Sequence, residues 1–326
     1  MPLIDMPVVE LEQYMGSSPR PADFDEYWDK ALKDLDEQDL NVEFIPANFQ
    51  TERAECFELF FTGVGGSRVH AKFLKPRYLE GKAPAVLQFH GYTGDCGDCG
   101  DWSSKLGYAG EGFVVASLDC RGQGGISEDL TAYRGTTMNG MIIRGLDDPD
   151  PEKLHYRNVF LDTVALARIV MDLPYVDETK VGAMGGSQGG GLTMACISLE
   201  PRINRAAPVY PFLSDYKRVW DMDLDQRAYE ELRSFFRHHD PLHVREDAIF
   251  EKLGYIDVSN LAPRVKSKVM MATGLMDEVC PPSTQYAAYN RLNCEKEHIL
   301  YPDFGHEYLP QFDDLTFRFM LDMKNE

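Results

Sequence analysis

One stretch decides the fold of this chain: "KVGAMGGSQGGGLTMA", residues 180–195. An apolar run leads into a turn of glycines around Ser187, and a helix-like segment follows. A G-x-S-x-G turn between a strand and a helix can hold a serine hydroxyl in a strained, exposed position as a nucleophile. Glycine at Gly185 and Gly189 would remove side chains that clash in so tight a turn. A phosphate cradle is the structural alternative, but neither phosphate-binding glycine pattern fits this window.

Short apolar runs bounded by turn residues recur on both sides of this stretch. They are "APAVLQFHG", "GFVVASLDCRG", "RAAPVYP", "KVMMATG" and "HILYP", with helix-like segments such as "YRNVFLDTVALARIVMDL" between several of them. Buried strands that alternate with helices indicate the α/β class. We therefore expect a mostly parallel, doubly wound sheet with helices on both faces, in which ligands bind at the carboxyl ends of the strands.

We expect one domain over residues 1–326, because the chain shows no internal repeat and no low-complexity linker. A helical extension at about 1–40 contains an amphipathic helix over 24–37, with apolar residues at helical spacing. Two runs around the glycines of 56–76 predict an antiparallel hairpin.

Two segments interrupt the alternation of strands and helices. The stretch at about 126–155 is polar and irregular, and the stretch at about 213–258 is helical and aromatic-rich, with an interruption at Pro241. We interpret both as insertions into the core, which form a lid, a subunit contact or both.

A serine nucleophile needs a base and an orienting acid. When the serine lies in a strand-to-helix turn of this kind, the acid follows it in the sequence and the histidine follows the acid. "KVMMATGLMDEVCPP" offers Asp277 after a buried strand, and "ILYPDFGHEYLP" offers His306 after the final strand. The carboxylate would fix the imidazole tautomer while His306 takes the proton of Ser187. Asp303 is the weaker candidate for the acid, since it lies only three residues from His306 on the same loop, where an aspartate favours a turn.

An oxyanion hole needs two preorganised N–H donors. The residue after the nucleophile, Gln188, would supply one of them. The loop after an earlier strand, "LQFHGYTG", offers the backbone amide of Tyr92 as the other, and the Tyr92 ring could also form a wall of the acyl pocket.

Charge and composition exclude several classes of partner. The net charge of −20 repels phosphate backbones and anionic lipid, so we expect neither nucleic-acid nor membrane binding. The N-terminus lacks the basic and apolar regions of a signal peptide, and no apolar run is long enough to span a bilayer. The seven cysteines have no disulfide-framework spacing, which is typical of reduced, buried thiols. We expect a soluble, cytoplasmic protein.

Two groups of residues have metal-like spacing. Cys96 and Cys99 form a C-x-x-C pair, but a second pair is missing and the Asp/Gly composition favours an exposed loop. His238, His239 and His243 are close in sequence, but Pro241 interrupts the helix that would align them. We therefore expect no metal and no organic cofactor.

Three short motifs resemble the signatures of carbohydrate esterase family seven, the acetyl xylan esterases also described as cephalosporin C deacetylases. They are "RGQGG" (121–125), "GGSQGGG" (185–191) and "GHE" (305–307). "HGYTG", "GLMDEVCPPSTQYAAYN" and the opening "FDEYWDKAL" are also similar to the family, so the resemblance spans nearly the whole chain. The "DCGDCGD" stretch departs from the family pattern and concerns the substrate pocket rather than the triad.

The resemblance implies an α/β-hydrolase with Ser187, Asp277 and His306 as the triad and the amides of Tyr92 and Gln188 as the oxyanion hole. It implies positioning roles for six further motif residues: Arg121, Gly122, Gln123, Gly185, Gly189 and Glu307. For Arg121 we expect hydrogen bonds that tie its loop to the triad loops. It also implies a homo-oligomer, often a ring-shaped hexamer in which the segment near 126–155 makes subunit contacts.

The function implied is removal of acetyl groups from small acetylated carbohydrates such as xylo-oligosaccharides, and of the acetyl group of cephalosporin C, through an acyl-enzyme. An acyltransferase could use the same triad with an alcohol acceptor, and a carboxylesterase could prefer another acyl group. A catalytically silent relative would usually have lost a triad residue. A peptidase of the prolyl oligopeptidase type would normally carry an N-terminal propeller.

Overall fold

The computed structural model describes residues 4–92, 100–133, 140–225 and 227–325. Its centre is one nine-stranded sheet with the order β1-β2-β3-β5-β4-β6-β7-β8-β9. The strands are β1 (Glu43–Pro46), β2 (Ala54–Thr62), β3 (Arg68–Pro76), β4 (Ala83–Phe89), β5 (Val114–Asp119), β6 (Val176–Gly186), β7 (Arg205–Val209), β8 (Lys268–Gly274) and β9 (Lys296–Tyr301).

The sheet is parallel where the predicted strand–helix alternation lies and antiparallel at one edge. From β5 through β4 to β9 every neighbouring pair is parallel, whereas β1, β2, β3 and β5 pair antiparallel. The expected hairpin is the β2–β3 pair, and the mostly parallel sheet is confirmed. Strand β1 is not anticipated by the sequence patterns, because it is short and three of its four residues are exposed.

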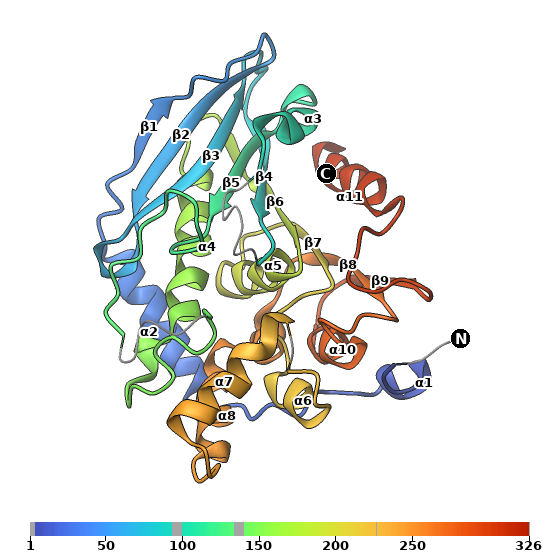
Figure 1. Ribbon diagram of the computed structural model, residues 1–326. Coiled ribbons are helices and arrows are strands. Elements are labelled where there is room, and N and C mark those ends of the chain that lie inside the picture. Colours follow the sequence, from blue (N-terminus) through green and yellow to red (C-terminus); the bar gives the residue numbers. More distant parts are fainter. Residues whose placement is uncertain (1–3, 93–99, 134–139, 226, 326) are drawn as a thin grey trace.

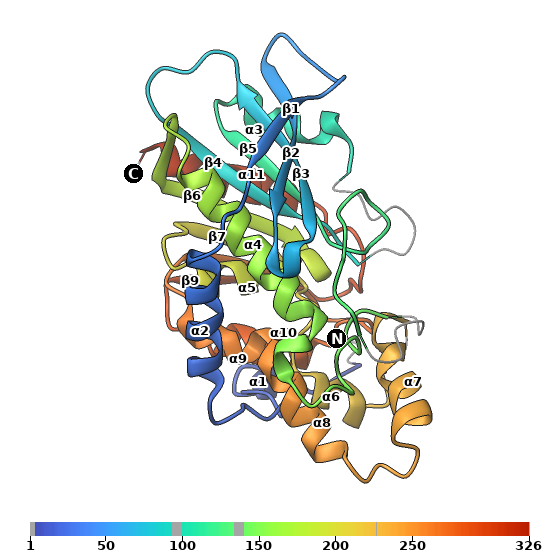
Figure 2. The same cartoon turned by 90° about the vertical axis from the view of Figure 1, so that its left-hand side faces the viewer.

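Helices cover both faces of the sheet (Figure 1). The α-helices are α1 (Val8–Leu11), α2 (Phe24–Asp36), α3 (Leu106–Gly110), α4 (His155–Met171), α5 (Gln188–Leu199), α6 (Tyr216–Asp221), α7 (Glu230–His239), α8 (Glu246–Leu253), α9 (Val258–Leu261), α10 (Pro282–Asn290) and α11 (Phe312–Leu321). The core on one face includes α2, α4 and α5, while α3 and α11 pack on the other face. Figure 2 shows α2 and α4 in front of the sheet.

The depth of each helix explains its sequence pattern. Helix α2 is an outer helix that buries only one stripe, in which Phe24, Trp28 and Leu35 face the core. The Trp28 ring stacks on Phe160 of α4 at 6.0 Å, and its indole N–H donates to the Tyr255 carbonyl. Helix α5 is buried at every residue, so its sequence is apolar and glycine-rich all round rather than amphipathic.

The two predicted insertions differ in their structure. Residues 126–133 and 140–150 contain neither α-helix nor strand, as expected of an irregular segment. The other segment holds α6, α7 and α8, and α7 ends two residues before Pro241. In Figure 1, α6, α7 and α8 lie together at the end of the molecule away from β1.

No helix in the described part of the chain is both long enough and apolar enough to cross a bilayer. Cys56, Cys120, Cys196 and Cys280 are buried and Cys294 is half-buried, and none of these five cysteines forms a disulfide. Their reduced state agrees with the prediction from their spacing. Cys96 and Cys99 lie outside the described residues.

Candidate active site

Ser187 lies in a strained turn between β6 and α5. Its φ of 56° and ψ of −120° place a non-glycine residue outside the ordinary regions, at a cost of about 1–3 kcal/mol. The backbone over-determines this conformation, because the Ser187 amide donates to the Val209 carbonyl and the Ser187 carbonyl accepts from Gly191 and Phe212. These hydrogen bonds therefore hold the strained turn in place, with the hydroxyl at the carboxyl end of β6.

The two framing glycines are required by close packing. A Cβ at Gly185 would lie 2.5 Å from the Phe89 carbonyl oxygen, and one at Gly189 would lie 2.0 Å from the same atom. Real Cβ atoms do not approach backbone so closely, so any side chain at either position would push β4 away from the turn. The glycines thus fit the turn against the end of β4.

Three side chains that are far apart in the sequence meet at this edge of the sheet. The Ser187 hydroxyl lies 2.9 Å from Nε2 of His306, and Nδ1 of His306 lies 2.8 Å from Oδ2 of Asp277. Asp277 is fully buried, whereas the His306 side chain remains 20% exposed. The imidazole therefore bridges a buried carboxylate and an accessible hydroxyl, which is the geometry that proton transfer from the serine requires.

Hydrogen bonds around Asp277 fix its carboxylate. Oδ1 accepts from the backbone amides of Val279 and Cys280, and Oδ2 accepts from the Gln285 side chain at 3.3 Å. The neighbouring Cys280 thiol stays neutral, because burial raises its pKa well above the ordinary value. The carboxylate is thus preorganised to receive Nδ1–H of His306.

The loops that carry Asp277 and His306 are packed against each other. The Met276 amide donates to the Phe304 carbonyl, and the Gly305 amide donates to the carboxylate of Glu307. Glu307 therefore closes the histidine loop on itself, in line with its expected positioning role. Asp303 is exposed in the preceding turn, as predicted for a residue that is not the acid.

The Gln188 side chain is held by Gln123 from the "RGQGG" motif. The two amide groups exchange hydrogen bonds of 2.8 and 2.9 Å, and the Tyr156 hydroxyl donates to Oε1 of Gln188 at 2.8 Å. All three residues are buried. As the first residue of α5, Gln188 has a backbone amide without a partner in the helix, so it is available to an oxyanion.

Tyr92 follows β4 in a loop that passes beside the nucleophile turn. A Cβ at Gly91 would lie 3.9 Å from the Gly186 carbonyl oxygen. The Tyr92 ring packs on Phe212 with ring centroids 5.9 Å apart, and burial raises the pKa of its phenol. The loop that carries Tyr92 thus passes beside the nucleophile turn.

The prediction that Arg121 ties its loop to the triad loops is wrong. The guanidinium forms a two-pronged ion pair with Asp162 of α4 at 2.6 and 2.7 Å, and it donates to the Val64 carbonyl and the Ser67 hydroxyl. These contacts join the loop after β5 to α4 and to the β2–β3 turn rather than to the triad loops. The neighbouring Gly122 has a φ of +68°, which favours glycine at that position.

Among the described residues, His238, His239 and His243 do not form a group of potential metal ligands. His238 contacts the Ser234 carbonyl, and His243 contacts Glu246. Within the described ranges, the one group of three potential metal ligands is Asp277, Cys280 and His306. Two of these three are the acid and the base beside Ser187.

Several residues at the site carry no sequence signal. Tyr210 follows β7 with a φ of 31°, and its ring lies 4.6 Å from the His306 ring. A cavity of about 190 Å³ beside the turn is lined by Gly186, Tyr210 and Tyr308, among others. Tyr156 and Phe212 likewise could not be found from the sequence, because nothing in their spacing links them to Ser187.

A parallel sheet with a serine–histidine–aspartate arrangement at the carboxyl ends of its strands defines an α/β-hydrolase. A family model described as acetyl xylan esterase matches residues 1–323. The chain therefore belongs to the acetyl xylan esterase family, and it is a carboxylic ester hydrolase.

Solved structures of this family are similar over nearly the whole chain. Acetyl Xylan Esterase 1 from Thermoanaerobacterium sp. JW/SL YS485 is 53% identical with a TM-score of 0.95, covering 98% of this chain and 99% of that one. An acetyl xylan esterase from Paenibacillus sp. R4 is 32% identical with a TM-score of 0.91, covering 97% and 99%. These similarities confirm the resemblance seen in the three short motifs.

One relative is a longer protein than this chain. Acetyl esterase Axe7A from Xylanibacter ruminicola is 28% identical over 292 residues, which are 86% of this chain. The match spans 62% of the length of that relative.

Proposed function

We propose that this chain is a serine esterase that removes acetyl groups from small acetylated carbohydrates such as xylo-oligosaccharides. One observation carries the proposal: His306 lies within hydrogen-bonding distance of both the Ser187 hydroxyl and the buried carboxylate of Asp277. Membership of the acetyl xylan esterase family supports the acyl group and the substrate class.

In the proposed mechanism, the Ser187 hydroxyl attacks the acetyl carbonyl while its proton moves to Nε2 of His306. The backbone amides of Tyr92 and Gln188 receive the negative charge on the carbonyl oxygen. The C–O bond to the sugar then breaks, and His306 protonates the departing sugar oxygen. Water attacks the acetyl-enzyme, gives a proton to His306, and releases acetate with the serine restored.

A cavity beside the nucleophile turn offers a surface for the substrate. It measures about 190 Å³ and is lined by Gly186, Tyr210 and Tyr308, among others. The exposed Tyr308 ring, two residues after His306, offers an apolar surface at the mouth of this cavity for a sugar face.

The test compares hydrolysis of acetyl, butyryl and octanoyl p-nitrophenyl esters, followed by acetylated xylo-oligosaccharides and cephalosporin C. Ser187→Ala is the blank, and we expect its rate to be lower by about 10⁵- to 10⁶-fold. The fastest rate on acetate supports the proposal. Faster hydrolysis of longer esters would contradict the substrate class, and equal rates for the wild type and Ser187→Ala would contradict the role of the serine. Transfer of acetate to an added alcohol in preference to water would indicate an acyltransferase.

We also propose a cytoplasmic homohexamer that acts on imported oligosaccharides. The buried free thiols support a reducing compartment, and Leu242 and Val244, both more than 80% exposed, offer an apolar contact surface. Light scattering tests the assembly directly: a mass of six times the 37.0 kDa chain supports it, and a monomer contradicts it.

A further inference from the structure

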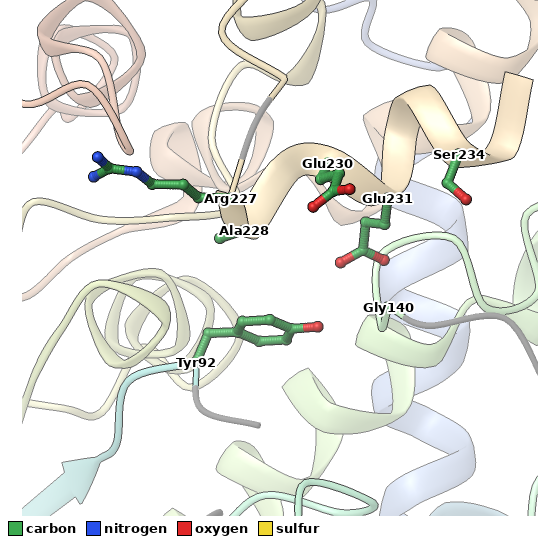
Figure 3. Close-up of a pocket in the computed structure, with 7 residues that line it drawn as sticks. All are labelled: Tyr92, Gly140, Arg227, Ala228, Glu230, Glu231 and Ser234. Carbon is green, nitrogen blue, oxygen red and sulfur yellow. The ribbon is translucent and has the colours of Figure 1, made fainter. Parts of the chain in front are cut away.

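The buried carboxylate of Glu231 and the Tyr92 ring line the same cavity. This cavity measures about 190 Å³ and is lined by Tyr92, Gly140, Glu231 and Ser234, among others. In Figure 3 the Tyr92 hydroxyl and the Glu231 carboxylate extend toward each other from opposite walls. Glu231 is only 6% exposed, although a glutamate in the first turn of a helix such as α7 could instead point its carboxylate into solvent.

The backbone of the irregular insertion is built around Glu231. Its Oε2 accepts from the Ile143 amide at 3.0 Å, and the amides of Met141 and Ile142 also hydrogen-bond to the carboxylate. Gly140 has a φ of +115°, and a Cβ there would lie 2.3 Å from the carboxylate oxygen. The carboxylate therefore fits into a turn that only glycine can form beside it.

The far end of this arrangement reaches Ser187 through packed rings. Tyr92 contacts Phe212, whose backbone amide donates to the Ser187 carbonyl at 3.0 Å. Phe212 also packs on Tyr229, two residues before Glu231, with ring centroids 4.4 Å apart. Tyr92 is thus held between the nucleophile turn on one side and the start of α7 on the other.

We propose that Glu231 is a positioning residue for the oxyanion hole: it fixes the Tyr92 side chain, and through it the Tyr92 backbone amide. The proposal rests on the proposed function in one respect, the use of the Tyr92 amide as an oxyanion donor. Burial of a carboxylate costs stability, and burial raises the pKa of Glu231 to about 7. Such a cost is common at functional sites, where stability is exchanged for geometry.

The test is a double-mutant cycle with Glu231→Gln and Tyr92→Phe, measured as kcat and KM on p-nitrophenyl acetate. Complete loss of an oxyanion donor costs about 10²- to 10³-fold in kcat, so loosening one should cost about tenfold, with KM changed less than twofold. Because both variants break the same link, the double variant should be no slower than the slower single one. Asp247→Asn, which removes one negative charge from the exposed start of α8, is the matched control.

Affinity for a boronic acid gives a second readout, since its tetrahedral adduct on Ser187 places an oxygen in the oxyanion hole. We expect Glu231→Gln and Tyr92→Phe to weaken this inhibitor by the factor by which they lower kcat. The proposal would be overturned if the kcat of the double variant fell by the product of the two single losses, or if kcat did not change in the single variants. A raised KM with kcat retained would also overturn it, and would place Glu231 in contact with substrate. If Glu231→Gln does not fold, Tyr92→Phe with unchanged kcat and inhibitor affinity overturns it alone. Failure of the wild type to hydrolyse any acetyl ester, with boronic acid binding intact, would instead contradict the proposed function.

Discussion

Two buried aspartates, Asp162 and Asp277, hold a basic partner in different ways. Asp162 grips Arg121 with both oxygens, and the two side chains are sealed at 2% and 0% exposure. Asp277 holds Nδ1 of His306 with one oxygen. The other ring nitrogen of His306, Nε2, faces the Ser187 hydroxyl near the surface. A buried pair of an acid and a base has a structural role when the protein satisfies every donor of the base. It can take part in catalysis when one nitrogen of the base remains within reach of an accessible group.

Of the variants that separate the two aspartates, Asp277→Asn should cause the larger loss of activity. The new side chain can still accept from the amides of Val279 and Cys280, so the fold should survive, but it no longer stabilises the required imidazole tautomer and its charged form. By analogy with the serine proteases, kcat should fall about 10⁴-fold with little change in melting temperature. Asp303→Asn, in the exposed turn beside His306, is the control. A loss below tenfold in Asp277→Asn would remove the contrast between the two aspartates.

Asp162→Asn should show the reverse pattern. It leaves the Arg121 charge buried without its counter-ion, which costs about 3–5 kcal/mol of unfolding free energy. Activity per folded molecule should stay within about threefold, because the pair does not touch the triad loops. Urea unfolding and active-site titration measure the two quantities separately. Inactive Asp162→Asn protein of wild-type stability would show that the pair is chemical after all.

Gln123→Ala lies between these extremes, since Gln123 touches the nucleophile turn without touching the triad. It leaves the Nε2 group of Gln188 short of a buried acceptor, at a cost of about 1–3 kcal/mol. We expect kcat on p-nitrophenyl acetate to fall about tenfold, because the first turn of α5 loses its support. Wild-type kcat together with lowered stability would make Gln123 as structural as Arg121.

The last effect is one on stability and concerns Glu231, a buried carboxylate that has no ion-pair partner among the described residues. Its pKa is raised by burial to about 7, while the backbone amides of residues 141–143 and the charge of Arg144 oppose the rise. The fold therefore binds this proton more tightly than the unfolded chain, whose glutamate pKa is about 4.3. Stability is lost as the pH rises from the unfolded value through about 7, and the loss is complete above that pH.

Glu231→Gln is neutral at every pH and should escape this loss. Relative to the wild type, its unfolding free energy should improve between pH 5 and pH 8, by at most about 3 kcal/mol. Urea unfolding at the two pH values checks the change, with Asp247→Asn as the control. A difference from the wild type that does not vary with pH would mean that the carboxylate has an ordinary pKa.

The strands and the order of the triad could be predicted because their signals are local. Each buried parallel strand is a short apolar run, and Asp277 and His306 each follow one such run directly. Strand β1 lacks that signal because an exposed edge strand needs no apolar sequence.

The partners of the motif residues could not be predicted in the same way. Arg121 meets Asp162 across 41 residues, and Gln188 meets Tyr156 across 32, with no spacing rule that connects them. Asp162 lies in the middle of a helical pattern, where a polar residue normally faces solvent. Only the packing of α4 against the sheet turns it inward.

The contact of Gly185 and Gly189 with the carbonyl of Phe89 has a consequence for how the protein melts. Since β4, β6 and the start of α5 touch without room for a single methyl group, we expect the turn to open only together with the strands that it joins. The Ser187 amide, which donates to the carbonyl of Val209 at the carboxyl end of β7, should exchange its hydrogen with solvent only when the whole domain unfolds. On gentle heating, esterase activity would then disappear with the last protected amides rather than with the first.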